Sequence, residues 1–222
     1  MGTRIQLTAA DGHRCGAFRA DPAGTPRGAI VVVQEIFGVN SHIRSVCDGF
    51  ARDGYVAIAP ALFDRVQPGV EIGYSQAEIE QGIGLKGKVA LDQALQDIQA
   101  AVAAVRGAGK VGIVGYCWGG FLAWQAAAKV DGLAASVAYY GGGVPDAVAV
   151  DPRIPVLMHF GRTDHAIPFA GVERFSKARP AVSIFLYDAG HGFNCDQRAS
   201  YDAASAKVAR ERTLSFFAKH VG

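Results

Sequence analysis

Apolar runs of the strand type recur along the chain, and segments with helical spacing separate them. The segment "GAIVVVQE" (28–35) is a continuous β-branched run, typical of a strand covered on both faces. Five further runs predict strands: "YVAIAPALF" (55–63), "KVGIVGYC" (110–117), "LAASVAYYG" (133–141), "IPVLMHFG" (154–161) and "AVSIFLYD" (181–188). Alternation of this kind predicts a mainly parallel sheet with helices on both faces.

The N-terminal segment departs from this alternation. Two short runs with period-two alternation flank Asp11-Gly12, which predicts an antiparallel β-hairpin. A helix is predicted after Asn40 or Ser41, either of which can cap it, and Gly54 is suited to end it in the left-handed conformation. We therefore expect a central sheet of about eight strands whose antiparallel edge is the N-terminal hairpin.

Two later segments have the spacing of helices. Residues 75–106 are helical in pattern, but Gly82, Gly84 and Gly87 weaken the first half by about 1 kcal/mol each relative to Ala, which predicts a break or mobile segment there. A final helix is predicted over residues 200–220, with four apolar anchors: Val208, Leu214, Phe216 and Phe217. The length of 222 residues suits one domain, residues 1–222.

Composition and charge narrow the possible partners. Half of the residues are hydrophobic, 19% are charged, and the net charge is +2 without any Lys/Arg-rich stripe, so we expect no nucleic acid partner. The N-terminus is too polar for a signal peptide, and no apolar run approaches the roughly 20 residues that span a bilayer. We expect a cytoplasmic protein without a membrane partner, either a monomer or a small homo-oligomer.

The four cysteines do not suggest a metal centre. No pair has CxxC spacing, so we expect neither a metal nor an organic cofactor. Cys15 and Cys47 are expected to be small buried hydrophobes. Cys117 differs because it stands between glycines, at the point where a predicted strand gives way to a predicted helix.

The motif "GYCWG" (115–119) has the spacing of the nucleophile elbow G-x-S-x-G, with cysteine in place of serine. The sharp turn strains the central residue, and its neighbours two positions away must lack side chains. The side chain of Cys117 is then expected to project above the sheet at a helix N-terminus, where the dipole favours a thiolate.

A nucleophile requires a base and a group that orients the base. Asp164 and His191 each follow a predicted strand. The order Cys117, Asp164, His191 is the chain order of nucleophile, acid and histidine in folds that contain this elbow. His165 is an alternative base and Asp188 an alternative acid.

The remaining histidines are expected to play other parts. His159 falls inside a strand and is expected to be a packed core residue. His13, His42 and His220 are expected to lie at the surface.

The residues after the first long apolar run are expected to contribute the oxyanion hole and a carboxylate to the site. The oxyanion hole is expected to use the N–H groups of Ile36 and Trp118. Glu35, at the end of a buried strand, needs a partner. It is either in a salt bridge with an arginine or a second acid–base group near the thiol.

With these residues in view, the chain resembles the dienelactone hydrolase family of the α/β-hydrolase fold. The segments "QEIFGVN", "GYCWGG", "AYYG", "TDHAIP" and "GHGFN" occur in family order and spacing over essentially the whole chain. The resemblance implies a Cys117–His191–Asp164 triad and a Glu35 that takes the thiol proton as substrate arrives. By the same comparison Phe37 and Tyr140 line the substrate pocket, and we expect Tyr116, next to the nucleophile, to line it as well.

The family's substrate-binding arginines are not at their usual positions. Well-known members bind a substrate carboxylate with two arginines, whereas the corresponding positions here offer Lys86 and Lys88 in one segment and Cys195 in the other, with Arg198 nearby. The expected function is cofactor-independent hydrolysis of a lactone ester through a thioacyl-enzyme. The alternatives are a general carboxylesterase or thioesterase acting on a neutral ester, and a non-hydrolytic small-molecule binding protein.

Overall fold

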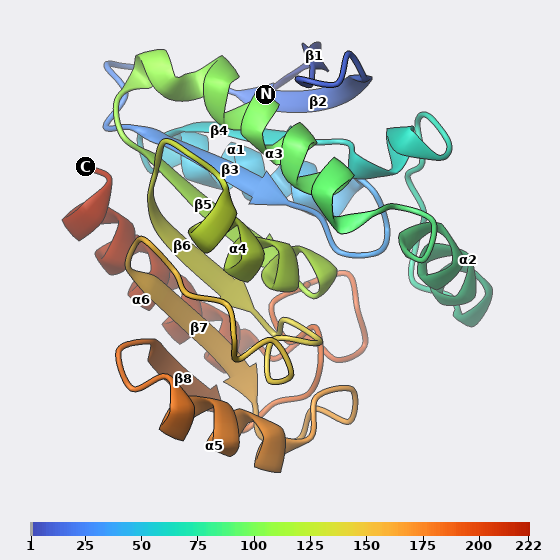
Figure 1. The fold of residues 1–222 in the computed structure, drawn as a ribbon, viewed down its shortest axis with the longest axis vertical. Coiled ribbons are helices and arrows are strands. Elements are labelled where there is room, and N and C mark those ends of the chain that lie inside the picture. Colours follow the sequence, from blue (N-terminus) through green and yellow to red (C-terminus); the bar gives the residue numbers. More distant parts are fainter. Residues whose placement is uncertain (1) are drawn as a thin grey trace.

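The computed structural model describes residues 2–222 and contains one eight-stranded sheet (Figure 1). The strand order across the sheet is β1-β2-β4-β3-β5-β6-β7-β8. The strands are β1 Thr3–Thr8, β2 Arg14–Ala20, β3 Ala29–Val33, β4 Val56–Pro60, β5 Val111–Tyr116, β6 Leu133–Tyr139, β7 Val156–Gly161 and β8 Ser183–Tyr187. Strands β1 and β2 form the predicted antiparallel hairpin, β2 pairs antiparallel with β4, and the other neighbours are parallel. The prediction of an α/β-hydrolase sheet is confirmed.

The register of the parallel strands aligns their carboxyl ends. The last paired residues lie side by side across the sheet: Val33 with Gly115, Tyr116 with Tyr139, and Gly161 with Tyr187. Loops that leave these strands therefore meet at one edge, which is where ligands bind in open α/β sheets.

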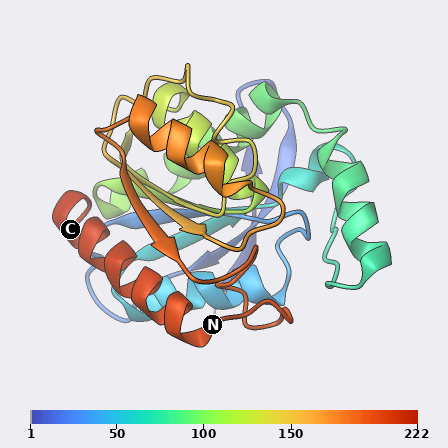
Figure 2. The same ribbon diagram turned by 90° about the horizontal axis from the view of Figure 1, so that it is seen from below.

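Helices cover both faces of the sheet (Figures 1 and 2). Helices α1 (Ser41–Arg52) and α6 (Ala203–His220) cover one face, and α3 (Leu91–Val105), α4 (Trp118–Lys129) and α5 (Phe169–Ala178) cover the other. Helix α2 (Gln76–Lys86) lies to one side, and the short 3₁₀ turns are η1 (Leu62–Arg65) and η2 (Arg106–Ala108). Within residues 2–222, no helix combines the length and apolarity needed to cross a membrane.

Each face has its own hydrophobic core. Phe50 of α1 and Phe217 of α6 are fully buried, and their rings meet edge to face at 6.0 Å. On the opposite face Ile98 and Val102 of α3 pack against buried strand residues. Each such side chain contributes about 1.5–3 kcal/mol through burial. Since β3 and β5 are buried along their whole length, these two cores hold the central strands firmly.

The predicted break in the glycine-containing segment lies at Gly87, the last of its three glycines. Helix α2 runs without interruption through Gly82 and Gly84, and the chain leaves helical structure only at Gly87. A β-carbon at position 82 would lie 2.1 Å from the backbone oxygen of Ile36, so glycine there allows a close approach between helix and loop. The prediction of a break in this segment is confirmed at Gly87, whereas Gly82 and Gly84 lie within the helix.

Three further expectations need correction. Val208 is 38% exposed, because α6 buries a row of smaller residues with Phe217 instead: Ala206, Ala209 and Thr213. Helix α5 was not predicted. His42, expected at the surface, is only 3% exposed because its face of α1 packs beneath the loop that contains Asp196.

Candidate active site

The turn between β5 and α4 holds Cys117 in a left-handed backbone conformation, with φ 54° and ψ −114°. The glycines around it are packed too tightly for any side chain. A β-carbon at Gly115 would lie 1.8 Å from the Gly119 oxygen, and one at Gly119 would lie 2.3 Å from the Val33 oxygen. The predicted elbow geometry is therefore present, and it places Cys117, the candidate nucleophile, at the N-terminus of α4.

Three side chains far apart in the sequence meet above this turn. His191 Nε2 lies 3.1 Å from Cys117 Sγ, and His191 Nδ1 lies 2.8 Å from Asp164 Oδ2. The other oxygen of Asp164 accepts the backbone N–H groups of Ala166 and Ile167 at 2.8 and 3.1 Å. The loop after β7 thus fixes the carboxylate, and the carboxylate fixes the imidazole.

The charge around His191 favours its protonated form. Burial of the ring opposes the charge, but the hydrogen bonds to Asp164 and Cys117 outweigh it and raise the pKa of His191 to about 10. At neutral pH the imidazole is therefore charged and faces a sulfur on one side and a carboxylate on the other. This arrangement can support nucleophilic attack by the sulfur and proton return by the imidazole.

The alternative acid and base lie outside this arrangement. His165 is exposed, and Asp188 is exposed and paired with Arg162 at 3.4 Å. His159 is fully buried with Nδ1 2.8 Å from the Tyr187 hydroxyl, and burial lowers its pKa to about 3. His159 is therefore a neutral core residue, as predicted.

The loop after β3 carries the second proposed oxyanion donor and is braced from two sides. Gly82 of α2 packs against the Ile36 carbonyl, as described above. Gly38 has φ +78°, and a β-carbon there would lie 1.8 Å from the Val70 oxygen. The other proposed oxyanion donor is the N–H of Trp118. Because Trp118 is the first residue of α4, this N–H has no acceptor within the helix.

Glu35 has the arginine partner that was one of its two interpretations. Its carboxylate is 1% exposed, and its Oε1 lies 3.2 Å from Arg198 Nη1. Burial disfavours the Arg198 charge, but the attraction of Glu35 outweighs it and raises the pKa of the guanidinium. Within residues 2–222 the Glu35 carboxylate has no hydrogen bond to Cys117, so its acid–base role stays a prediction.

Aromatic rings surround the candidate triad. Tyr140 has φ 36°, and its ring lies 5.2 Å from the His191 ring, edge to face. Phe37 packs against Tyr74 at 4.6 Å and beneath the Arg198 guanidinium at 5.5 Å. These positions agree with a pocket wall, although contact with a substrate stays a prediction.

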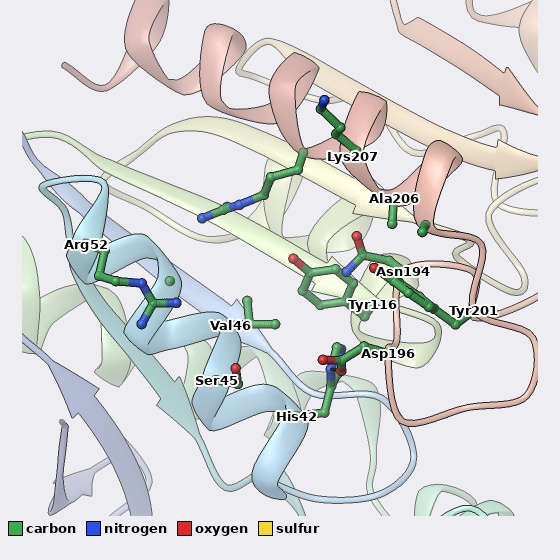
Figure 3. Close-up of a pocket in the computed structure, with 13 residues that line it drawn as sticks. His42, Ser45, Val46, Arg52, Tyr116, Asn194, Asp196, Tyr201, Ala206 and Lys207 are labelled. Atoms are coloured by element: carbon green, nitrogen blue, oxygen red, sulfur yellow. Dashed lines mark hydrogen bonds and ion pairs between the residues drawn. The ribbon is translucent and has the colours of Figure 1, made fainter.

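Tyr116 faces a different space. It lines a hollow of about 430 Å³ between α1, α6 and the loop of residues 194–203 (Figure 3). None of the three candidate triad residues lines this hollow. The Tyr140 ring packs against the His191 ring, whereas Tyr116 lines this separate hollow. The place of Tyr116 in the substrate pocket therefore stays a prediction.

Two features near the site were missed by the sequence analysis. Tyr74 contacts the Cys195 sulfur through its hydroxyl at 3.2 Å and accepts the Asn40 amide at 3.0 Å. Glu35, His42 and Cys195 bring three donor atoms of metal-ligand type within 4.8 Å of one another. No spacing motif links these residues, so only the folded chain reveals the cluster.

The comparisons with known proteins concern the family and the fold of the chain. A model of the dienelactone hydrolase family matches residues 15–221. The carboxymethylenebutenolidase of Pseudomonas putida is 35% identical over 227 residues, covering 96% of this chain and 95% of that protein. The crystal structure of a putative dienelactone hydrolase from Klebsiella pneumoniae superposes with a TM-score of 0.86 at 33% identity, covering 99% of this chain and 100% of that one. An esterase of Pyrococcus furiosus, 14% identical with a TM-score of 0.72 over 100% of this chain and 92% of that one, shares the fold.

Proposed function

Because the chain belongs to the dienelactone hydrolase family, we propose that this carboxylic ester hydrolase opens a small lactone with Cys117 as its nucleophile. The observation that carries the proposal is the continuous contact from sulfur to imidazole to carboxylate, at 3.1 and 2.8 Å. A non-hydrolytic binding protein has no physical need for such an arrangement. The partner of the site is a small ester or lactone molecule.

The proposed reaction has two halves. The Cys117 sulfur attacks the carbonyl carbon, and the N–H groups of Ile36 and Trp118 stabilise the developing oxyanion; each such donor typically contributes roughly 2.7–4 kcal/mol. Collapse of the intermediate breaks the ester C–O bond, and His191 protonates the leaving oxygen. His191 then takes a proton from water, whose oxygen attacks the thioester carbon. The C–S bond breaks and releases the acid and the Cys117 thiolate, to which the proton lost at activation returns. Asp164 orients the imidazole and stabilises the imidazolium at the steps in which it is present.

Arg198 and Glu35 link substrate charge to thiol activation in this proposal. A carboxylate on the substrate competes with Glu35 for the buried guanidinium, which holds only Oε1 of Glu35. The released Glu35 then accepts the proton of Cys117. The alternative, a neutral ester or thioester substrate, draws support from the same ion pair, because Glu35 already neutralises Arg198 and leaves no unbalanced cation for an anionic substrate.

One kinetic comparison tests both the proposed nucleophile and the proposed class of substrate. We expect kcat/KM on an anionic lactone to exceed that on a neutral ester of the same size. We expect Cys117→Ala to lose at least about 10³-fold on both, because the nucleophile is gone. Intact-mass analysis after rapid quenching should detect an acyl adduct on the parent protein and none on Cys117→Ala.

The control is Cys47→Ala, which removes a buried thiol outside the candidate triad and should keep full activity. Undiminished hydrolysis by Cys117→Ala, with thermal unfolding equal to that of the parent, would exclude Cys117 as the nucleophile. A preference for the neutral ester would leave the nucleophile in place and favour the alternative substrate class.

A further inference from the structure

Three potential metal ligands converge beside the candidate active site. Glu35 follows β3, His42 lies in the first turn of α1, and Cys195 lies in the loop before α6, and all three are at least nine-tenths buried. One donor atom from each lies within 4.8 Å of the other two. The mechanism proposed above uses Glu35 but gives no task to His42 or Cys195.

The hydrogen bonding of His42 leaves one of its ring nitrogens without a partner. Its Nδ1 lies 3.2 Å from Oδ1 of Asp196, a carboxylate that only accepts, so we assign the ring proton to Nδ1. The Nε2 atom is buried and has no hydrogen-bond partner among residues 2–222. A buried nitrogen without a hydrogen-bond partner is costly, and a bound cation would supply the missing partner. Figure 3 shows His42 and Asp196 side by side on the wall of the hollow.

The other two ligands also have supporting groups. The Tyr74 hydroxyl accepts hydrogen bonds from the Asn40 amide and from the Cys195 thiol, whose Sγ lies 3.2 Å away, and it can donate its own proton to the sulfur once that thiol is deprotonated. Arg198 binds Oε1 of Glu35, and within the described chain Oε2 has no hydrogen bond. Metal ligands in proteins are typically oriented by such outer hydrogen bonds, and all three residues have one.

We propose that Glu35, His42 and Cys195 form a binding site for a zinc-class divalent cation. One oxygen, one imidazole nitrogen and one sulfur are ligand types that zinc accepts together, and three protein ligands leave a fourth position for water. A tetrahedral site needs its ligand atoms roughly 3.5 Å apart, so any of these donor atoms that lie farther apart, up to the 4.8 Å limit, must move closer when the ion binds. The thiolate and the carboxylate balance the charge of the ion, and His42 also lines the neighbouring hollow.

The site has a consequence for activity. An ion bound at Glu35 occupies the carboxylate that is proposed to accept the Cys117 proton, so zinc should inhibit hydrolysis. This consequence rests on the proposed function, whereas the binding itself does not. Zinc would then act as an inhibitor of the hydrolase, and catalysis would need no metal.

The Cys117–His191 pair is a competing zinc site, so binding is measured in the Cys117→Ala protein. Isothermal titration with ZnCl₂ should give one ion per chain. Cys195→Ala or His42→Gln in the same background should weaken binding by roughly tenfold or more, by comparison with outer-shell losses of that size. Cys47→Ala in that background is the matched control and should bind as tightly as Cys117→Ala alone.

Cobalt substitution gives a second readout. Co²⁺ bound to Cys117→Ala should show a thiolate-to-cobalt charge-transfer band that disappears with Cys195→Ala, and circular dichroism would establish that each variant is folded. If Cys195→Ala does not fold, His42→Gln alone carries the affinity test. Absence of stoichiometric binding to Cys117→Ala, or unchanged affinity in the folded ligand variants, would overturn the site. Binding without inhibition of the parent enzyme would retain the site and count against the role of Glu35.

Discussion

At the scale of single residues, Cys117 occupies a backbone conformation that costs roughly 1–3 kcal/mol in a non-glycine residue. The surrounding structure must supply that energy. Gly115 and Gly119 do so by letting the strand and the helix approach within distances that any β-carbon would prevent. The two carboxylate oxygens of Asp164 likewise have separate partners. One accepts backbone N–H groups, and the other is hydrogen-bonded to His191.

This division predicts the effect of Asp164→Asn. The amide oxygen should keep the backbone N–H groups, so the amide NH₂ faces His191 Nδ1 and forces the ring proton onto Nε2, towards Cys117. We expect kcat to fall on the order of 10⁴-fold with little loss of stability, as for the equivalent change in serine proteases. Steady-state kinetics and thermal unfolding measure both. Asp188→Asn is the control, and equal kinetics in the two variants would refute the assignment of Asp164.

At the scale of elements, helix α2 acts as a brace for the loop that follows β3. Its position depends on Gly82, whose α-carbon lies against the Ile36 carbonyl. The capping box at Ser75 and Glu78 sets where the helix begins, so Gly82 has a fixed place along the axis. The geometry of the proposed oxyanion donor therefore depends on a helix that contributes no reacting group.

Two alanine substitutions in the same helix separate this contact from helix propensity. Gly82→Ala should lower the free energy of unfolding by about 1–3 kcal/mol through overpacking and should reduce kcat by moving Ile36. Gly84→Ala meets no atom within 4 Å and should stabilise the protein by up to about 1 kcal/mol with kcat unchanged. Urea denaturation and steady-state kinetics measure both. A stabilised, fully active Gly82→Ala protein would contradict the bracing role.

At the scale of the whole molecule, the parallel register brings five loops to one edge of the sheet. The aligned ends of β3, β5, β6, β7 and β8 place Glu35, Cys117, Tyr140, Asp164 and His191 in one region. The folded chain therefore raises the pKa of His191 above its value in the unfolded chain. Folding and proton binding are therefore linked.

This linkage predicts a pH dependence of stability. The pKa of His191 is about 10 in the folded chain and about 6.5 when unfolded, so its contribution is complete below pH about 6.5 and disappears as the pH rises towards 10. The difference in unfolding free energy between the parent and His191→Gln should shrink across this range, by at most about 1.4 kcal/mol per pH unit. Urea denaturation at intervals from pH 6 to 10 measures it. A constant difference would contradict the raised pKa.

The sequence by itself determined the sheet, the order of its strands along the chain and the chemistry of the elbow. A continuous β-branched run such as 28–35 is typical of a strand covered on both faces, and the glycines around Cys117 permit a sharp turn that side chains would block. The order of Cys117, Asp164 and His191 followed from the same local signals. These features are local, because period and turn chemistry depend on neighbours in the chain.

Only the tertiary structure decided the partners of buried polar groups. The pairing of Glu35 with Arg198, the burial of His42 beneath Asp196 and the contact of Gly82 with Ile36 all join residues from different elements. Propensity and periodicity carry no information on which loop lies over which helix, because that depends on packing across the sheet. For the same reason the cluster of Glu35, His42 and Cys195 has no signature in the sequence.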